Sequence, residues 1–219
     1  MTVLPMFPLG SVLFPAMPTA LRVFEERYIV MLSTVLGDDE PRFGIVLIER
    51  GSEVGGGEQR FDVGTVARIT RLEPGEGMVG IIAVGTERIA VTRWLDDDPY
   101  PSAEVRTLAA LEWDDDLWPL RERAERLVRR TLAQASEFSP QQWPADIVLD
   151  DDPVAACWQL AGIAPVGALD HVRLLRSSSL RELLDGIIDT VELAAELLTA
   201  TWPDEIDGLD GFPASPDPE

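Results

Sequence analysis

The apolar residues of this chain change their spacing once, near residue 110, and this change limits the folds that it can adopt. Up to about residue 108 they form short segments rich in Val and Ile that Gly and Pro interrupt, a pattern typical of β-strands. From about residue 115 they recur every three or four residues, which indicates amphipathic helices. We therefore expect an α+β fold, with a strand-rich domain at residues 1–110 and a helical bundle at residues 111–202.

The strand-rich part contains turn signals between its apolar segments. Glycines gather at residues 51–57, Pro74 precedes Gly75, and Gly85 separates two further segments. Short strands at irregular spacing favour a small, strongly bent sheet or a half-open barrel. The predicted strands span residues 12–14, 20–24, 43–49, 61–72, 77–85, 87–94 and 102–108.

A charged cluster, Glu25-Glu26-Arg27, follows the second of these strands and raises the question of a chemical site. Acidic residues in the first turn of a helix interact favourably with the positive end of its dipole. The apolar residues around the cluster recur at helical spacing, so we interpret it as the start of a helix over residues 25–36. The residues expected on one face of this helix are Phe24, Tyr28, Met31, Leu32 and Val35.

The second part of the chain predicts a helical bundle that ends in a long helix. One helix covers about residues 116–138, and another starts at Asp152, an N-cap followed by proline, and ends at Gly162. A shorter helix follows. Ser179 and Glu182 then form a capping box before the last helix, whose apolar stripe is wide enough for packing inside a bundle.

Two segments lack any apolar period. Residues 203–219 are acidic and contain prolines and glycines, so we expect a disordered tail there. Residues 50–60 are rich in glycine and are expected to form a mobile hairpin tip.

The chain contains no lysine, because all 18 of its basic residues are arginines. A Walker A phosphate loop needs a lysine for the phosphates, and a Schiff base or a Ser–Lys dyad also needs one. The absence of lysine therefore excludes a Walker A loop, a Schiff base and a Ser–Lys dyad from these 219 residues.

The net charge is strongly negative. The 39 acidic residues exceed the 18 arginines, which gives a formal charge of −21. Nucleic acids and anionic membranes bind proteins through cationic side chains, so this charge opposes both kinds of partner. It favours neutral or cationic partners instead.

Seven stretches of the sequence form an ordered series. They are LPMFPLGSVLFPAMPTALRVFEERY, FGIVLIERGSEVG, VGTVARITRLE, IIAVGTERIAV, PYPSAEV, DDPVAACWQLAGIAPV and SSSLRELLDGIIDTVELA. Taken in this order, they resemble the N-terminal domain of Lon proteases. The resemblance covers about residues 3–198 and departs from the family at Ala16, where glycine is favoured, and at Glu26, where proline is favoured.

The resemblance implies a PUA-like β pseudo-barrel with one helix, followed by the helical bundle. It also implies a stand-alone module that recognises unfolded polypeptide or a partner protein. In full-length Lon proteases an ATPase and a Ser–Lys peptidase domain follow this module. Since the ATPase and the Ser–Lys peptidase both need a catalytic lysine, we expect no enzymatic activity from these 219 residues.

Aromatic residues near the junction of the two parts are the candidate polypeptide-binding surface. Six tryptophans are more than usual. We expect some to fill the seam between sheet and bundle and others to line an apolar groove, which is what binding an exposed hydrophobic segment requires. The candidates are Trp94, Pro99, Tyr100, Trp113 and Trp118.

Structural roles are expected for the remaining candidates, which are Cys157, His171 and the Asp-rich runs. Cys157 and His171 are single residues of their kinds, and no third orienting group or oxyanion site marks a nucleophile pair. The Asp-rich runs at residues 96–98, 114–116 and 150–152 lack the EF-hand pattern. We therefore expect neither a cofactor nor a metal.

Two alternatives to polypeptide binding stay open. PUA-like folds often bind RNA, and a small hydrolase that uses Cys157 or His171 is a second option. We expect a cytoplasmic location, because no signal peptide or apolar run of 18 residues is present. The sequence leaves the client and the oligomeric state open, with a weak homo-oligomer among the options.

Overall fold

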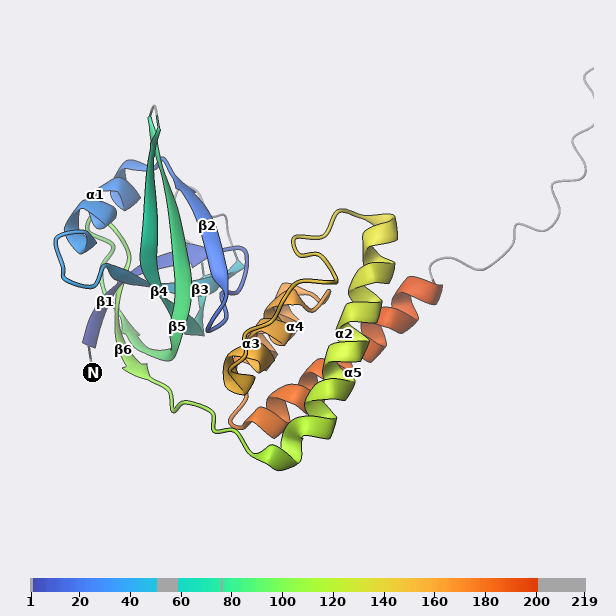
Figure 1. Ribbon diagram of the computed structural model, residues 1–219. Coiled ribbons are helices and arrows are strands. Elements are labelled where there is room, and N and C mark those ends of the chain that lie inside the picture. The colour runs from blue at the N-terminus through green and yellow to red at the C-terminus, as the bar shows by residue number, and fades with distance from the viewer. Residues whose placement is uncertain (1, 51–58, 76, 201–219) are drawn as a thin grey trace, which may run out of the picture.

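The computed structural model describes residues 2–50, 59–75 and 77–200 of the chain. The tail that we expected to be disordered, residues 203–219, lies outside these ranges, as does most of the glycine-rich segment 50–60. Strands occupy the N-terminal part and helices the C-terminal part, which confirms the predicted α+β class (Figure 1).

Six strands form one mixed sheet that closes on itself. The strand order is β2-β5-β4-β3-β1-β6, and β5 also pairs with β6, so five of the strands complete a ring. β1 runs parallel to β3, whereas the other pairings are antiparallel. The ring confirms the expected bent, barrel-like sheet. Its strands are β1 (Thr2–Leu9), β2 (Pro18–Val23), β3 (Arg42–Arg50), β4 (Gln59–Gly75), β5 (Met78–Trp94) and β6 (Ser102–Thr107).

Three details of the strand prediction were wrong. The first strand lies at Thr2–Leu9, whereas residues 12–14 form no strand. Gly85 is not a turn, because β5 passes through it without a break. The long β4 and β5 each bend across the ring and carry register shifts in their pairing, as strands in a strongly curved sheet do.

The charged cluster starts a helix, as predicted. α1 (Glu26–Val35) buries Tyr28 and three other apolar residues, while Phe24 is exposed rather than buried. Both departures from the Lon pattern now have a structural meaning. Glu26 is the first helical residue, where proline is favoured, and Ala16 has a φ of 59°, a left-handed conformation that favours glycine.

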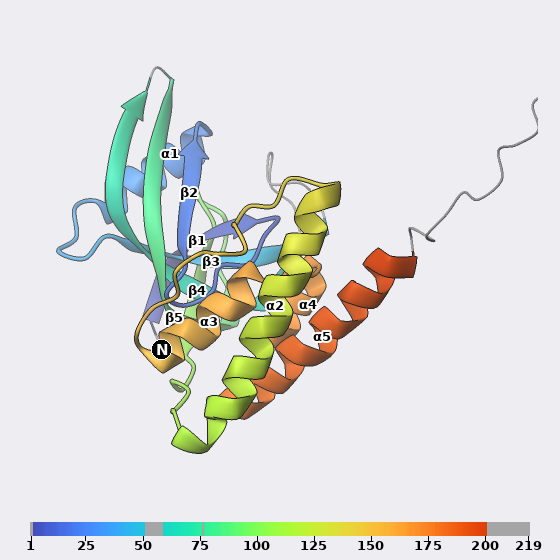
Figure 2. The same cartoon turned by 45° about the vertical axis from the view of Figure 1, so that its right-hand side comes forward.

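Within the described residues, four α-helices follow the sheet and pack into a bundle beside it (Figure 1 and Figure 2). The N-cap prediction holds, since the Asp152 carboxylate accepts a hydrogen bond from the Ala155 amide at 2.8 Å. The Glu182 amide likewise donates to the Ser179 hydroxyl at 3.1 Å. These helices are α2 (Trp118–Phe138), α3 (Pro153–Ile163), α4 (Ala168–Leu175) and α5 (Leu180–Ala200).

Gly162 does not end its helix, contrary to the prediction. It lies inside α3, and a Cβ placed on it would come within 2.8 Å of the Met17 side chain. The glycine therefore allows α3 to approach the segment between β1 and β2. One hydrophobic cluster accordingly extends from the sheet into the bundle without interruption.

Arg88 connects the sheet to the bundle. Its guanidinium donates to the carbonyl oxygens of Leu175 at 2.9 Å, Ser177 at 2.6 Å and Ala109 at 2.8 Å. It also lies 4.9 Å from the ring centroid of Trp158. Its hydrogen-bond acceptors are thus main-chain carbonyls at the end of α4 and just after β6. In the part of the chain that the structure describes, no helix has the length and apolarity to cross a membrane.

Candidate functional site

A groove of about 790 Å³ runs between α2 and the segment that leads into α3. Its α2 wall carries Trp118, Arg121, Glu125 and Arg129, and residues 145–151 form the opposite wall. These residues come together because the chain turns back along the bundle after α2 (Figure 1). The groove therefore depends on tertiary structure rather than on a local sequence motif.

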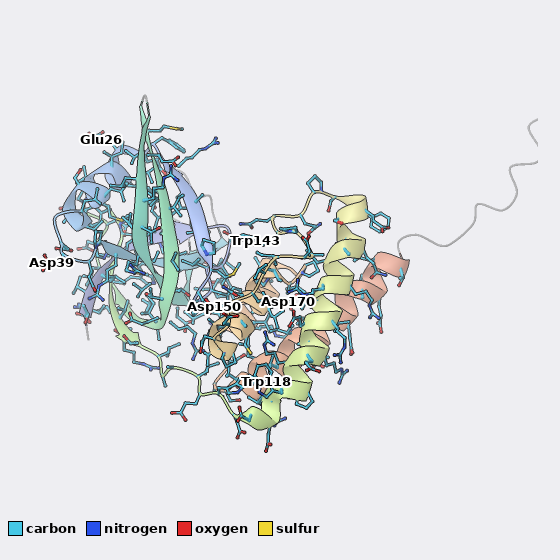
Figure 3. All side chains as sticks on the ribbon, viewed as in Figure 1. Glu26, Asp39, Trp118, Trp143, Asp150 and Asp170 are labelled. Atoms are coloured by element: carbon cyan, nitrogen blue, oxygen red, sulfur yellow. The ribbon has the colours of Figure 1, made fainter. Side chains whose placement is uncertain are left out.

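One of the predicted aromatic residues, Trp118, lines the groove near the start of α2 (Figure 3). Trp113 packs against it, with the two rings edge to face and their centroids 4.9 Å apart. The Trp113 indole nitrogen donates to the Asp115 carboxylate at 3.0 Å, which orients its ring. Trp118 is 42% exposed, and the Arg121 guanidinium lies 5.3 Å from its ring centroid. Trp118 thus offers an accessible, positioned aromatic surface.

Arg129 organises the middle of the groove. It donates to the carbonyl oxygens of Ala145 at 2.6 Å and Ile147 at 3.0 Å, and to the Glu125 carboxylate at 2.9 Å. Glu125 also lies 3.6 Å from Arg121. A guanidinium that holds two main-chain carbonyls recognises polypeptide backbone without regard to sequence.

The charge around the groove is negative. Two arginines line it against four carboxylates, those of Glu125, Asp146, Asp150 and Asp151. Three further aspartates, residues 114–116, lie between Trp113 and Trp118 in the sequence. An apolar surface with an acidic rim attracts cationic segments and repels phosphate.

The other three predicted residues lie elsewhere. Trp94 ends β5, and its ring lies 4.5 Å from the guanidinium of Arg60, which in turn pairs with Asp97 at 2.7 Å. Tyr100 is partly buried against the main hydrophobic cluster, whereas Pro99 is exposed. A role of these three residues in polypeptide binding stays a prediction.

A second cleft of about 620 Å³ opens at the other end of the bundle. The second half of α5 forms one wall of this cleft, where Leu193 and Leu197 are 59% and 60% exposed. Trp143 and His171 contribute to the rest of the lining. The lining mixes apolar side chains with polar ones such as Gln141 and Thr190, and Asp170 is its charged residue.

Cys157 and His171 have packing roles in this structure. His171 is edge-on to Phe14 at 5.5 Å between centroids, and its Nε2 lies 3.2 Å from the Ala164 carbonyl oxygen. Burial lowers the pKa of His171, which keeps the ring neutral at pH 7. Burial also raises the pKa of the Cys157 thiol to about 12. A neutral, buried thiol is a poor nucleophile.

The thiol of Cys157 should therefore be inert in the folded protein. We expect negligible reaction with a disulfide reagent such as DTNB at pH 8, and release of one thiol per chain once urea exposes it. The absorbance of the released thiolate measures both states. Rapid modification of the native protein would contradict the assigned burial.

The Asp-rich runs gather no evident metal site. Among residues 2–50, 59–75 and 77–200, no group of three or more potential ligand side chains is placed to hold an ion. Asp114 and Asp152 instead cap helices, because their carboxylates accept main-chain amide hydrogens.

Sequence reasoning missed the second wall of the groove. Arg121 and Arg129 are two arginines among several on α2, so neither stands out in the sequence. A signal was nevertheless present between α2 and α3, where Trp143, Ala145, Ile147 and Leu149 recur at every second position. Such alternation indicates an extended segment that packs one of its two sides against a hydrophobic core.

Comparison with known proteins identifies a family with this architecture. A family model described as the ATP-dependent protease La (LON) substrate-binding domain matches residues 3–192. The chain belongs to this family. The Lon resemblance inferred from the sequence is therefore confirmed.

Curated Lon proteases are longer than this chain. The Lon protease of Escherichia coli (strain K12) is 26% identical over 203 residues, which cover 89% of this chain and 25% of that protein. Lon protease 2 of Myxococcus xanthus is 33% identical over 106 residues, 47% of this chain and 13% of that protein. The chain thus spans about a quarter of the length of its E. coli relative.

Two solved Lon structures share the fold. A Lon N-terminal domain protein from Xanthomonas campestris superposes with a TM-score of 0.60 at 24% identity, over 86% of this chain and 98% of that one. The N-terminal domain of a Mycobacterium avium complex Lon protease gives 0.62 at 14% identity, over 87% and 98%. At these identities the likeness concerns the fold.

Proposed function

We propose that this Lon-family chain is a non-catalytic module that binds unfolded polypeptide at the groove beside Trp118. The observation that carries the proposal is the combination of an exposed, oriented tryptophan with an arginine that binds main-chain carbonyls. The matching family is one of substrate-binding domains, which supports the proposal. Folded proteins bury their apolar side chains and pair their carbonyls, so such a groove selects unfolded segments.

The acidic rim of the groove favours clients that carry positive charge. Segments that combine apolar side chains with arginine or lysine would meet both the tryptophan pair and the carboxylates. Nucleic acids and anionic membranes are unsuitable partners for the same electrostatic reason. A cytoplasmic protein or unfolded polypeptide is thus the proposed partner, and weak self-association stays an expectation.

Replacing Trp118 by alanine should weaken the binding of a basic unfolded polypeptide about tenfold, because a buried interface tryptophan commonly contributes more than ~1.4 kcal/mol. The fold should survive, since Trp118 is 42% exposed at the start of α2. Fluorescence anisotropy of a labelled polypeptide measures the dissociation constant in both proteins.

Two controls make this measurement specific. Phe138→Ala removes an aromatic ring that is 52% exposed at the far end of the same helix, and it should leave affinity unchanged. A labelled acidic polypeptide of equal length should bind more weakly than the basic one, with the difference shrinking at high salt. Equal affinity of wild type and Trp118→Ala would locate the binding surface elsewhere, and no saturable binding would refute the proposal.

A further inference from the structure

One segment of this chain already lies on the bundle as an unstructured polypeptide would. Residues 139–151, here called the strap, run from the end of α2 back to the start of α3 (Figure 1 and Figure 2). They form neither helix nor strand, and one turn closes from the Pro144 carbonyl to the Ile147 amide at 3.2 Å. From residue 141 to residue 150 the side chains alternate strictly between half-buried and exposed.

The bundle holds the strap mainly at its main chain. Arg129 on α2 binds the carbonyl oxygens of Ala145 and Ile147. Gln159 on α3 accepts a hydrogen bond from the Asp150 amide at 2.7 Å, and its amide nitrogen donates to the Ala16 carbonyl at 3.2 Å. Contacts of this kind do not depend on the side chains of the segment that is bound.

The inward side chains of the strap supply the apolar part of the binding. Trp143, Ala145, Ile147 and Leu149 pack against the main hydrophobic cluster, whereas Val148 between two of them is 90% exposed. The strap thus combines apolar side chains at alternate positions with carbonyls bound by arginine. This is the chemistry that the proposed function assigns to a client.

The strap also borders both openings of the bundle. Residues 145–151 form one wall of the groove beside Trp118, and residues Gln141–Trp143 line the cleft at the other end. Two of the Arg129 hydrogen bonds are committed to the strap. A client that reaches the middle of the groove must compete for these donors.

From these contacts we infer that the strap occupies part of the client-binding surface and limits client affinity by competition within the chain. The inference rests on the proposed function and adds regulation of the same groove. A tethered segment has a high effective concentration, so it competes strongly with a client. The apparent affinity of the client is its intrinsic affinity multiplied by the fraction of molecules whose strap is displaced. Loosening the strap therefore strengthens client binding.

A paired set of variants tests the inference. Ile147→Ala combined with Leu149→Ala removes inward anchors of the strap and leaves Trp118, Arg121 and Arg129 intact. We expect this double variant to bind the labelled basic polypeptide about fivefold more tightly than wild type. Leu169→Ala, which truncates an exposed aliphatic side chain on α4 outside the groove, should bind like wild type.

A strap peptide added in trans provides the second arm. A synthetic peptide of residues 139–151 should bind the double variant and displace its client, while wild type, whose own strap is seated, should bind the peptide at least fivefold more weakly. Circular dichroism establishes that each variant is folded. Should the double variant unfold, Trp143→Ala carries the same test.

The outcomes separate the two ideas. Clients that bind wild type and the folded double variant equally, or the double variant more weakly, overturn competition by the strap and leave the proposed function standing. Clients that bind none of the proteins refute the proposed function, and the inference about its regulation fails with it.

Discussion

Replacing Arg88 by alanine should lower the free energy of unfolding by about 3–5 kcal/mol. This is the largest loss that we expect from replacing any one of the arginines. Arg88 is 7% exposed and donates three hydrogen bonds to carbonyl oxygens, two of them from residues that follow or end α4. Alanine would leave these carbonyls buried without a donor. It would also remove the cation from the face of Trp158.

Chemical denaturation followed by circular dichroism measures this loss. Arg88→Lys keeps a positive charge but lacks the planar fork that reaches several carbonyls, so an intermediate loss is expected. Arg106→Ala alters an exposed arginine on β6 and should change stability by less than about 0.5 kcal/mol. A loss below about 1 kcal/mol for Arg88→Ala would show that water or a rearranged side chain replaces the guanidinium.

The second large effect concerns Gly85. A methyl group there should lower the free energy of unfolding by about 3 kcal/mol, because the clash is with main chain that cannot move away cheaply. A Cβ on Gly85 would overlap the Phe14 carbonyl oxygen and lie 2.9 Å from the Phe14 carbonyl carbon. Hydrogen bonds of 2.9 Å, from the Ala16 amide to Gly85 and from the Gly85 amide to Met17, hold this segment against β5.

The expected damage extends beyond the strand. The Phe14 ring lies 6.1 Å from Trp158 and 5.5 Å from His171 between centroids, so displacing Phe14 disturbs the contact between sheet and bundle. Gly80→Ala on the same strand is the matched control. Its nearest neighbour, the Cβ of Glu73, would lie at 3.3 Å, and a loss under about 1 kcal/mol is expected. Equal losses at the two glycines would refute the close-approach explanation.

Both residues act where the sheet meets the bundle, and neither lines the groove beside Trp118. This separation matters for the binding experiments. A variant at Arg88 that weakens client binding would do so by changing the fold, whereas Trp118→Ala should weaken binding at unchanged stability. Measuring both quantities on each variant distinguishes the two causes.

Local structure was readable from the amino-acid order. The Asp152 cap of α3 and the Ser179 cap of α5 both involve partners within four residues. The proximity of Trp113 and Trp118 also follows from their separation by five residues at a helix start. Such features depend on short-range geometry, which propensity and periodicity report directly.

Glycine shows where this reading fails. Gly85 predicted a turn and Gly162 a helix end, yet each lies inside a regular element against the segment between β1 and β2. The lack of a Cβ permits both a special backbone conformation and a close approach of two segments. Only the packed structure shows which of the two properties is used.

The sequence by itself determined the α+β class, the helix starts, the absence of lysine chemistry and the family to which the chain belongs. Tertiary structure alone decided the closure of the ring through β5 and β6, the carbonyl partners of Arg88, and the meeting of Arg129 with the strap. The physical reason is range. Capping and periodicity act over a few residues, whereas the contacts of Arg129 and Arg88 join positions 16 to 89 residues apart that only the folded chain brings together.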